Sequence, residues 1–433
     1  MNILVLNGSP KGENSVTLQT VRYLQELYPG HTYRELHVSQ KIRSFEKDFS
    51  AAKEALYAAD LIVFSYPVYT FLVPAQLHRF IELMKENGVE LQGKFATQIS
   101  TSKHFYDTTA HEFIRQNCED LGLRYLQGLS ADMEDLLKEK GQEEADRFFR
   151  HTLWLAGDAS VRTPSAGLGR RVAVVADLAE GTEEVSAMIE AFKAACPYTV
   201  DVVDLQQFPF AGGCLGCFHC AADGTCVYKD GFDAFLRENI QTADATVYAF
   251  AIKDHSMGYR MKLYDDRQFC NGHRTVTMGK PVGYLVSGDL ESEPNLRTLI
   301  EARAQVGGNY LAGVACSGEG CNEAIEALAK ELQYAVETGY AQPANFYGVG
   351  GMKIFRDLIY QMQGLMQEDH RFYKEHGFYD DFPQKKKGTI LGMYLVGAMM
   401  KNKKLSKKIG TNMTKGMLMP YEKVLKKGKK LRK

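Results

Sequence analysis

Four cysteines stand close together in the second half of the chain, at Cys214, Cys217, Cys220 and Cys226. Glycines lie between and beside them, so four thiolates can converge on one centre. This compact spacing suits a [4Fe–4S] cluster. It suits zinc less well, because structural zinc normally pairs two CxxC units across a longer gap. Zinc and relict or redox-active thiols are the alternatives.

A second group of reactive side chains lies near the N-terminus, in the sequence NGSPKGENSVT of residues 7–17. The pattern predicts that a buried strand ends here and a helix begins, where free N–H groups and the helix dipole attract phosphate. The sequence matches neither GxGxxG nor the Walker A motif, which disfavours dinucleotides and nucleoside triphosphates. The alternative is an ordinary strand–helix turn with a polar cap. We expect phosphate contacts from Ser9, Lys11, Asn14, Ser15, Val16 and Thr17.

Two further loops follow the third and fourth predicted strands of the same half. In an open α/β sheet, ligands bind at the carboxyl ends of the strands, so these loops meet the phosphate loop at one edge. Together they offer an aromatic wall and small polar groups, which suits a mononucleotide that carries a ring system. The alternative is that the aromatic side chains only pack. The expected contact residues are Pro67, Val68, Tyr69, Thr70, Phe71, Ser100, Thr101 and Ser102.

The elements that must position these residues alternate between strand and helix. Apolar runs predict strands at 3–6, 31–38, 61–66, 95–100 and 123–129, and an amphipathic helix at 133–155 closes this half. The pattern then repeats, with strands at 172–175, 199–205, 243–247, 281–287 and 310–316 and a closing helix at 319–337. We therefore predict an α/β protein with two doubly wound, five-stranded parallel sheets in tandem, followed by a helical, basic C-terminal extension.

The predicted boundaries follow from composition. Residues 1–157 form the first domain, and 158–170 form a linker rich in Ser, Thr, Pro and Gly. Residues 171–340 form the second domain, 341–384 a helical extension and 385–433 a basic tail. With no apolar run near 18 residues and no basic leader before the first strand, we expect a cytoplasmic protein.

The first half resembles a known family. NGSPKGENSVT and PVYTFLVPAQLHRFIE together resemble the flavodoxin-like NAD(P)H-dependent FMN reductase and iron–sulfur flavoprotein families, over nearly all of residues 1–155. The resemblance implies that the first loop holds the FMN phosphate and that 67–71 and 100–102 flank the isoalloxazine. The cysteine block and the pattern Lys262-x3-Asp266-Arg267 also resemble the iron–sulfur flavoproteins. These families typically form dimers or tetramers, so a homodimer is among the expected assemblies.

The two halves have complementary losses. At an offset of 169, the residues matching Lys11, Asn14 and Ser15 are Glu180, Glu183 and Glu184, and carboxylates repel a phosphate. Conversely, the first half has no cysteine in its loop at 39–49, where the second half has its cysteine block. The hypothesis is a fused pseudo-dimer, with FMN in the first domain and the cluster in the second.

The charge is distributed very unevenly. The chain has 52 basic and 53 acidic residues, but residues 385–433 carry 15 lysines, one arginine and only Glu422 as an acid. An apolar stretch at 389–400, followed by five lysines at 401–408, resembles an interfacial helix beside a polybasic patch. We expect the tail to be solvated or to contact an anionic membrane surface or an acidic partner. Scarce arginine and aromatic residues disfavour nucleic acid.

These observations predict a flavin-dependent oxidoreductase or electron-transfer protein. NAD(P)H is the expected reduced donor, or a protein donor takes its place, and the acceptor is a small molecule or a protein. The cofactors are FMN and [4Fe–4S], with zinc as the alternative metal. No acid–base pair or nucleophile stands out, so catalytic residues are unassigned and hydrolases and transferases are disfavoured. The alternative function is an FMN- or zinc-binding carrier or structural module without turnover.

Overall fold

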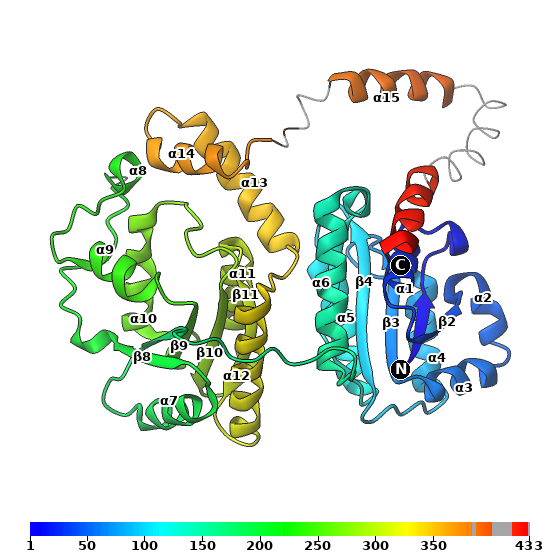
Figure 1. The fold of residues 1–433 in the computed structure, drawn as a ribbon, viewed down its shortest axis with the longest axis horizontal. Coiled ribbons are helices and arrows are strands. Elements are labelled where there is room, and N and C mark those ends of the chain that lie inside the picture. Colours follow the sequence, from blue (N-terminus) through cyan, green and yellow to red (C-terminus); the bar gives the residue numbers. More distant parts are fainter. Residues whose placement is uncertain (218, 381, 383–386, 401–417, 432–433) are drawn as a thin grey trace. The chain divides into compact units, whose positions relative to one another are not determined.

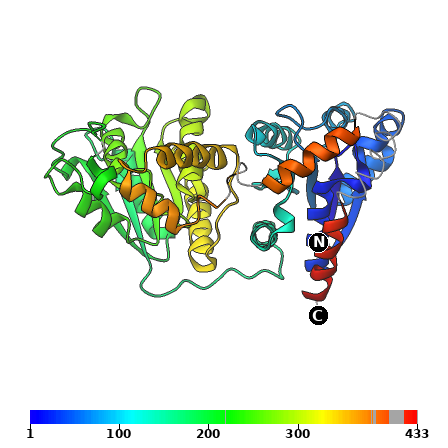
Figure 2. The same cartoon turned by 90° about the horizontal axis from the view of Figure 1, so that it is seen from above.

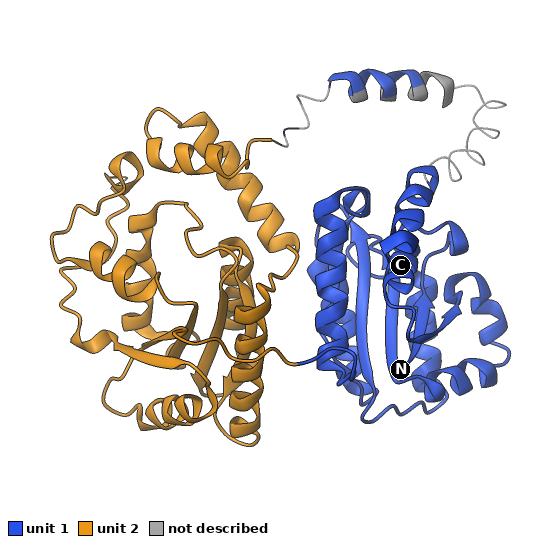
Figure 3. Cartoon of the chain, viewed as in Figure 1, with its two compact units in different colours: residues 1–162, 382–433 blue, residues 163–381 orange. Residues whose placement is uncertain are grey.

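The computed structural model describes residues 1–217, 219–380, 382, 387–400 and 418–431. The chain divides into two compact units, one of residues 1–162 and 382–433 and one of residues 163–381 (Figure 3). The five lysines that follow the apolar stretch, at 401–408, lie outside the described residues.

The first unit contains a parallel sheet in the order β2-β1-β3-β4-β5, with β6 also paired to β4 (Figure 1). Its strands are β1 (Asn2–Asn7), β2 (Thr32–Leu36), β3 (Leu61–Pro67), β4 (Phe95–Ser102), β5 (Arg124–Tyr125) and β6 (Leu129–Asp132). Its helices are α1 (Val16–Leu27), α2 (Val38–Phe45), α3 (Ser50–Ala58), α4 (Ala75–Glu86), α5 (Asp107–Asp120) and α6 (Glu139–Leu155).

Alternation along the strands fills two cores. Leu4 and Leu6 of β1 pack with residues of α2 to α5 on one face of the sheet, whereas Ile3 and Val5 pack with α1 and α6 on the other. Burial on both faces explains why the strands read as continuous apolar runs. The sheet order with its single reversal places the carboxyl ends of β1 and β3 at the switch point where ligands bind in such folds.

The second unit repeats this topology, with the order β8-β7-β9-β10-β11. Its strands are β7 (Arg171–Ala176), β8 (Thr199–Asp204), β9 (Ala245–Ala251), β10 (Pro281–Ser287) and β11 (Tyr310–Cys316). Its helices are α7 (Glu183–Ala195), α8 (His219–Asp223), α9 (Phe232–Phe235), α10 (Gly258–Arg267), α11 (Pro294–Gly307), α12 (Cys321–Thr338), α13 (Phe346–Gln361) and α14 (Gln367–Glu375). Helices cover both faces of each sheet (Figure 2). The predicted fold class of two flavodoxin-like sheets in tandem is confirmed.

Three local expectations differ from the structure. The single strand predicted at 123–129 is two short strands, β5 and β6, which pair with successive parts of β4. The stretch predicted as a helix from residue 133 begins with a 3₁₀ turn at Asp135–Leu137, and α6 starts only at Glu139. Residues 39–49, treated as a loop, contain most of α2, because Val38 and Phe45 find apolar partners under the sheet.

The C-terminal extension is helical in two places. α15 (Lys387–Met400) exposes apolar side chains, and a second helical stretch follows at 418–431. Tyr421 and Val424 of that stretch are 4% and 8% exposed, because they join the core formed by α1 and α6. The end of the basic tail is therefore part of the first unit. No helix among the described residues is both long and apolar enough to cross a membrane.

Candidate functional site

Three loops of the first unit surround one cavity of about 350 Å³ at the carboxyl edge of its sheet. The lining contains twelve of the fourteen side chains expected from the sequence, namely Ser9, Lys11, Ser15, Val16, Thr17, Pro67, Val68, Tyr69, Thr70, Phe71, Thr101 and Ser102. Asn14 is exposed outside the lining. Ser100 is fully buried behind it. Loops distant in sequence thus meet because parallel strands end at a common edge.

The loop between β1 and α1 is shaped by its own polar groups. Ser15 caps α1 by accepting a hydrogen bond from the Leu18 N–H at 3.3 Å, which leaves the hydroxyl proton free to donate. Ser9 and Thr17 are almost fully buried, with 2% and 1% exposure. Two buried hydroxyls, a serine cap and the helix N-terminus form a cradle of donors that fits a phosphate.

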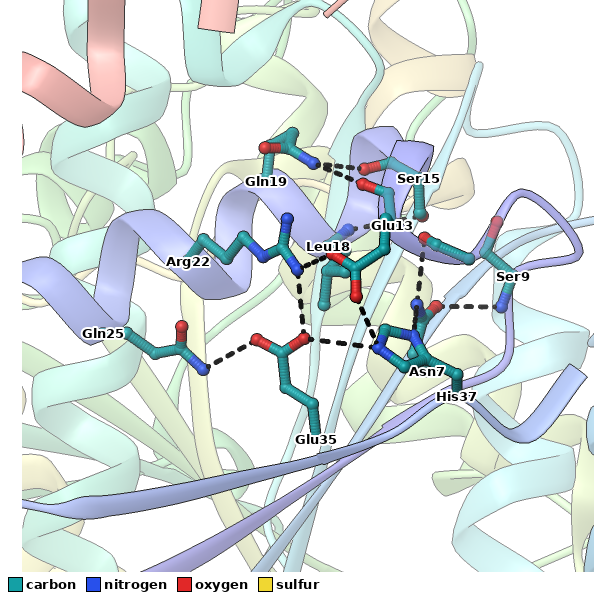
Figure 4. Close-up of polar contacts among 11 residues, drawn as sticks. Asn7, Ser9, Glu13, Ser15, Leu18, Gln19, Arg22, Gln25, Glu35 and His37 are labelled. Carbon is teal, nitrogen blue, oxygen red and sulfur yellow. Dashed lines mark hydrogen bonds and ion pairs between the residues drawn. The ribbon is translucent and has the colours of Figure 1, made fainter. Parts of the chain in front are cut away.

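Asn7, at the end of β1, ties this loop together (Figure 4). Its side-chain oxygen accepts from the Ser9 N–H at 3.1 Å, and its amide nitrogen donates to the Gly12 carbonyl at 3.0 Å. Gly12 has φ of +52° and faces the Gln40 side chain, which a Cβ at that position would overlap. The positive φ therefore favours glycine here, whereas the exposed Gln40 side chain can move aside.

The loop after β3 provides an aromatic wall in a strained turn. Tyr69 and Leu72 exchange backbone hydrogen bonds of 2.8 and 3.1 Å, and between them Thr70 and Phe71 have φ of +49° and +69°. Left-handed backbone is costly for residues other than glycine, and especially for β-branched threonine, so the surrounding structure must impose it. Tyr69 and Phe71 are each 45% exposed, which leaves their rings available to a ligand.

The loop after β4 completes the site and carries residues that the sequence did not reveal. Lys103, Phe105 and Met133 also line the cavity. The rings of Phe71, Phe105 and Tyr106 form one exposed cluster, with centroids 4.9 to 5.4 Å apart. The motif KHFYD contains two aromatic residues next to a strand end, and that signal could have indicated this extension of the wall.

Behind this loop lies a buried polar network. Thr101 and Thr17 are joined through their hydroxyls at 2.6 Å, which links the third loop to the first. Ser100 Oγ lies 2.8 Å from Nε2 of His111, and burial lowers the pKa of His111 to about 4. An imidazole that stays neutral at ordinary pH supports the loop without adding charge beneath the cavity.

The first 128 residues match the family described as NADPH-dependent FMN reductase. This similarity covers less than half of the chain, and the matched residues 1–128 are called the FMN reductase domain for that similarity alone. The match ends within the first unit, so the FMN reductase domain is one part of a longer chain. No curated protein matches the sequence.

Solved structures that match cover about the length of this FMN reductase domain. They include an FMN-dependent NADH-azoreductase from Bacillus anthracis in complex with FMN, with 13% identity, 36% coverage of this chain, 97% of the other and a TM-score of 0.27. General stress protein 14 from Treponema denticola, also in complex with FMN, has 13% identity, with 37% of this chain and 99% of the other covered and a TM-score of 0.27. An NADPH-quinone reductase from P. pentosaceus has 14% identity, with 35% of this chain and 95% of the other covered and a TM-score of 0.28. The assignment rests on the family match and not on these structures.

The second unit retains the backbone of the strained turn but not its chemistry. Lys253 and Ser256, at an offset of 184 from the pair in the FMN reductase domain, exchange backbone hydrogen bonds of 2.9 Å. The two residues between them have φ of +50° and +59°. A turn that is rare in proteins and sits at equivalent positions in both units is a structural record of duplication.

The phosphate loop of the FMN reductase domain has no counterpart in the second unit. α7 has Glu183 and Glu184 in its first turn, and Ser287 donates a hydrogen bond from its hydroxyl to Glu184. Carboxylates at a helix N-terminus take up the favourable dipole interaction themselves. A phosphate there would be repelled by both side chains.

All four cysteines of the compact block line a second cavity, of about 420 Å³. Cys214 and Cys217 are exposed and Cys220 and Cys226 half-buried. Burial, and then the charge of Cys214, raises the pKa of the Cys220 thiol. A metal centre that deprotonates its ligands would overcome this effect, so metal binding at the loop should release protons.

Arg267 at the end of α10 anchors the cysteine loop. It is 1% exposed, pairs with Asp230 at 2.7 and 2.8 Å and donates to the Gly212 carbonyl at 2.9 Å. Its Nη2 also lies 3.9 Å from Cys226 Sγ. The guanidinium lowers the pKa of Asp230 to about 2. The Lys262-x3-Asp266-Arg267 pattern thus provides an ion pair between Lys262 and Asp266 and a buried cation beneath the thiols.

The spread of the thiols bears on the metal they could hold. Four sulfurs bound to one zinc ion at about 2.3 Å lie about 3.8 Å from one another. Within the described residues, no three of these sulfurs lie within 4.8 Å of one another. A [4Fe–4S] cluster takes one thiolate on each of four irons and therefore accepts sulfurs that are farther apart.

Proposed function

We propose that the protein is an FMN-dependent oxidoreductase that moves electrons between a reduced donor, FMN in the first unit and a [4Fe–4S] cluster in the second. The cavity carries the first half of this proposal, since candidate phosphate donors and aromatic rings line one pocket. When bound, FMN can accept two electrons from a donor and pass them on one at a time. The chain binds and orients the cofactor and shields it from water.

The residues have separate roles in this proposal. Ser9, Ser15 and Thr17 donate to the phosphate, whereas Tyr69 and Phe71 contact the ring system. The exposed rings of Phe105 and Tyr106 extend the apolar wall, where a nicotinamide of NAD(P)H or another flat substrate can stack. Catalysis then depends on placing the donor beside the flavin and not on an acid–base pair.

The cysteine cavity supports the second half of the proposal. All four thiols line it together with Arg267, whose Nη2 lies 3.9 Å from Cys226 Sγ, and the compact spacing of the cysteines in the sequence suits a cluster better than zinc. Because the second unit has two acids in the first turn of α7, where a phosphate would be repelled, we assign one FMN to each chain. The losses in the two units fit a fused pair in which each copy kept one cofactor.

Anaerobic reconstitution tests the assignment. Wild-type protein should show flavin absorbance with a broad iron–sulfur shoulder and should oxidise NAD(P)H when an electron acceptor is added. Cys217→Ser should lose iron and retain FMN, and Cys196→Ser, outside the block, should retain both. A protein that binds FMN without turnover with any donor would support a carrier function. Zinc in place of iron after anaerobic reconstitution would contradict the cluster.

The tail supports a place at an anionic membrane surface. Ile390, Leu391, Tyr394 and Leu395 of α15 are between 44% and 75% exposed, and lysines stand on both sides of this helix in the sequence. An exposed apolar helix beside clustered lysines binds anionic lipid by burial and by charge together. An acidic partner protein or a second copy of the chain is the competing occupant.

Vesicle co-sedimentation tests this proposal. The whole protein should sediment with vesicles that contain anionic phosphatidylserine and much less with neutral vesicles. Leu391→Glu together with Leu395→Glu should abolish sedimentation, whereas Leu168→Glu, at a fully exposed leucine of the second unit, should not. Equal sedimentation of all variants would exclude α15 as the membrane contact.

A further inference from the structure

A histidine outside the cavity contacts the framework of the phosphate loop. His37 lies between β2 and α2, at the N-terminal end of α2. Its Nδ1 lies 3.1 Å from the side-chain nitrogen of Asn7 (Figure 4). The imidazole does not line the pocket and its side chain is 18% exposed. Any effect on a ligand must therefore pass through Asn7.

The orientation of the Asn7 amide is fixed by two backbone groups. The Ser9 N–H needs an acceptor and the Gly12 carbonyl needs a donor, so the oxygen must face Ser9 and the nitrogen must face Gly12. The second N–H of the same amide then points at Nδ1 of His37. Nδ1 must accept this hydrogen bond, which assigns the ring as neutral with its proton on Nε2.

The other side of the imidazole faces two carboxylates. Nε2 lies 2.7 Å from a carboxylate oxygen of Glu13 and 3.9 Å from one of Glu35. The Arg22 guanidinium bridges the two carboxylates. These are the charged groups that the structure places against the ring. Two carboxylates against the one guanidinium of Arg22 leave one negative charge unbalanced beside a neutral imidazole, so these groups favour a second proton on the ring, whereas the Asn7 amide opposes it.

We propose that His37 is a positioning residue that makes the phosphate loop sensitive to pH. A second proton on the ring places an N–H of His37 against an N–H of Asn7. To accept from the imidazolium, the Asn7 amide must turn over, and it then opposes the Ser9 N–H with a donor and the Gly12 carbonyl with an acceptor. Two bonds that shape the loop are lost.

The consequence is a linkage between proton binding and cofactor binding. This inference rests on the proposed function, in which this loop holds the FMN phosphate. In that case a neutral His37 ring favours the FMN-bound protein. A second proton on His37 should therefore weaken FMN binding. By reciprocity, bound FMN should oppose protonation of His37.

Fluorescence titration of the whole apoprotein with FMN measures this linkage. The FMN phosphate itself gains a proton near pH 6, so FMN affinity depends on pH in every variant. The test is therefore how much more the affinity changes with pH in wild type than in His37→Asn. His37→Asn keeps an oxygen that can accept from Asn7 but has no proton to gain. His37→Leu offers no acceptor, and His78→Asn, on exposed α4, is the matched control.

When the pH is lowered from 8 to 5.5, the dissociation constant for FMN should rise in wild type and in His78→Asn. This rise should be about tenfold larger than the rise in His37→Asn, because loss of a hydrogen bond weakens binding by about that factor. At pH 8, His37→Asn should bind within a few-fold of wild type and His37→Leu about tenfold more weakly. An equal pH dependence in wild type and His37→Asn would overturn the role of His37 while leaving FMN binding intact. No FMN binding by wild type at pH 8 would overturn the proposed function as well.

Discussion

Ser15 is the residue at which the two units differ most informatively. In the first unit it caps α1 with its hydroxyl, whereas at the sequence offset of 169 the second unit has Glu184, which lies in the first turn of α7 beyond the N-cap Thr182. A hydroxyl can cap the helix and still donate to a phosphate, whereas a carboxylate can only accept. The acids in the first turn of α7 thus set its N-terminus apart from that of α1.

Changing Ser15→Glu should remove FMN from the protein. The substitution places a carboxylate where the phosphate should lie, and both its repulsion and the lost donor weaken binding, by at least tenfold and on the order of 2 kcal/mol in total. Flavin content after desalting and a titration with FMN measure the effect. Glu184→Ser is the matched control and should leave one FMN per chain. Normal flavin content in Ser15→Glu would rule out this loop as the phosphate site.

His111 should make the first unit less stable in acid. Burial lowers its folded pKa from 6.5 to about 4, so the unfolded chain takes up the proton first as pH falls. Its contribution to stability therefore declines between pH 6.5 and about 4 and changes no further below that. Trp154, the only tryptophan, lies in α6 and reports unfolding of the first unit by fluorescence.

Urea unfolding followed at Trp154 tests the role of His111. The free energy of unfolding of His111→Gln should fall less than that of wild type between pH 6.5 and 4. His78→Gln, at an exposed histidine, should follow wild type. Parallel curves for all three proteins would show that His111 does not titrate in this way.

Among the elements, the helical stretch at 418–431 links the tail to the site. Tyr421 donates a hydrogen bond from its hydroxyl to the Met133 carbonyl, and Met133 lines the cavity. Glu139 and Glu26 pair with Lys427 and Lys429 of the same stretch. A segment that seemed only basic in sequence therefore completes the core between α1 and α6.

Removing the Tyr421 side chain should destabilise the first unit. Tyr421→Ala deletes a buried ring and its hydrogen bond, which should cost about 2 kcal/mol or more in the free energy of unfolding measured at Trp154. Because Met133 lines the cavity, FMN should also be held more weakly. Lys426→Ala, at an exposed position of the same stretch, should change neither quantity. Unchanged stability in Tyr421→Ala would mean that the stretch does not dock in solution.

What the sequence could predict depended on how local each signal was. β3 and β10 were clear because strands buried on both faces read as continuous apolar runs. The short β5 and β6 were not, since two or four residues contain too little periodicity. His37 and Phe105 were missed because their roles arise only when β2 and β4 are brought beside β1 and β3.

At the scale of the whole molecule, the proposed function assigns one cofactor to each of two units that share a topology. Each unit has the same strand order and the same left-handed turn, so the differences lie in the side chains at the loops. The FMN reductase domain kept hydroxyls at its first helix, and the second unit gained thiols above a buried arginine. Fusion of the two would fix the ratio of the two cofactors.

The most direct test is the content of flavin, iron and sulfide in the anaerobically reconstituted whole chain, measured beside Ser15→Glu and Cys217→Ser. Wild type should contain one FMN, four irons and four sulfides for each chain. Ser15→Glu should lose only FMN, and Cys217→Ser only iron and sulfide. Two FMN per chain, or loss of both cofactors in both variants, would contradict the assignment of one cofactor to each unit.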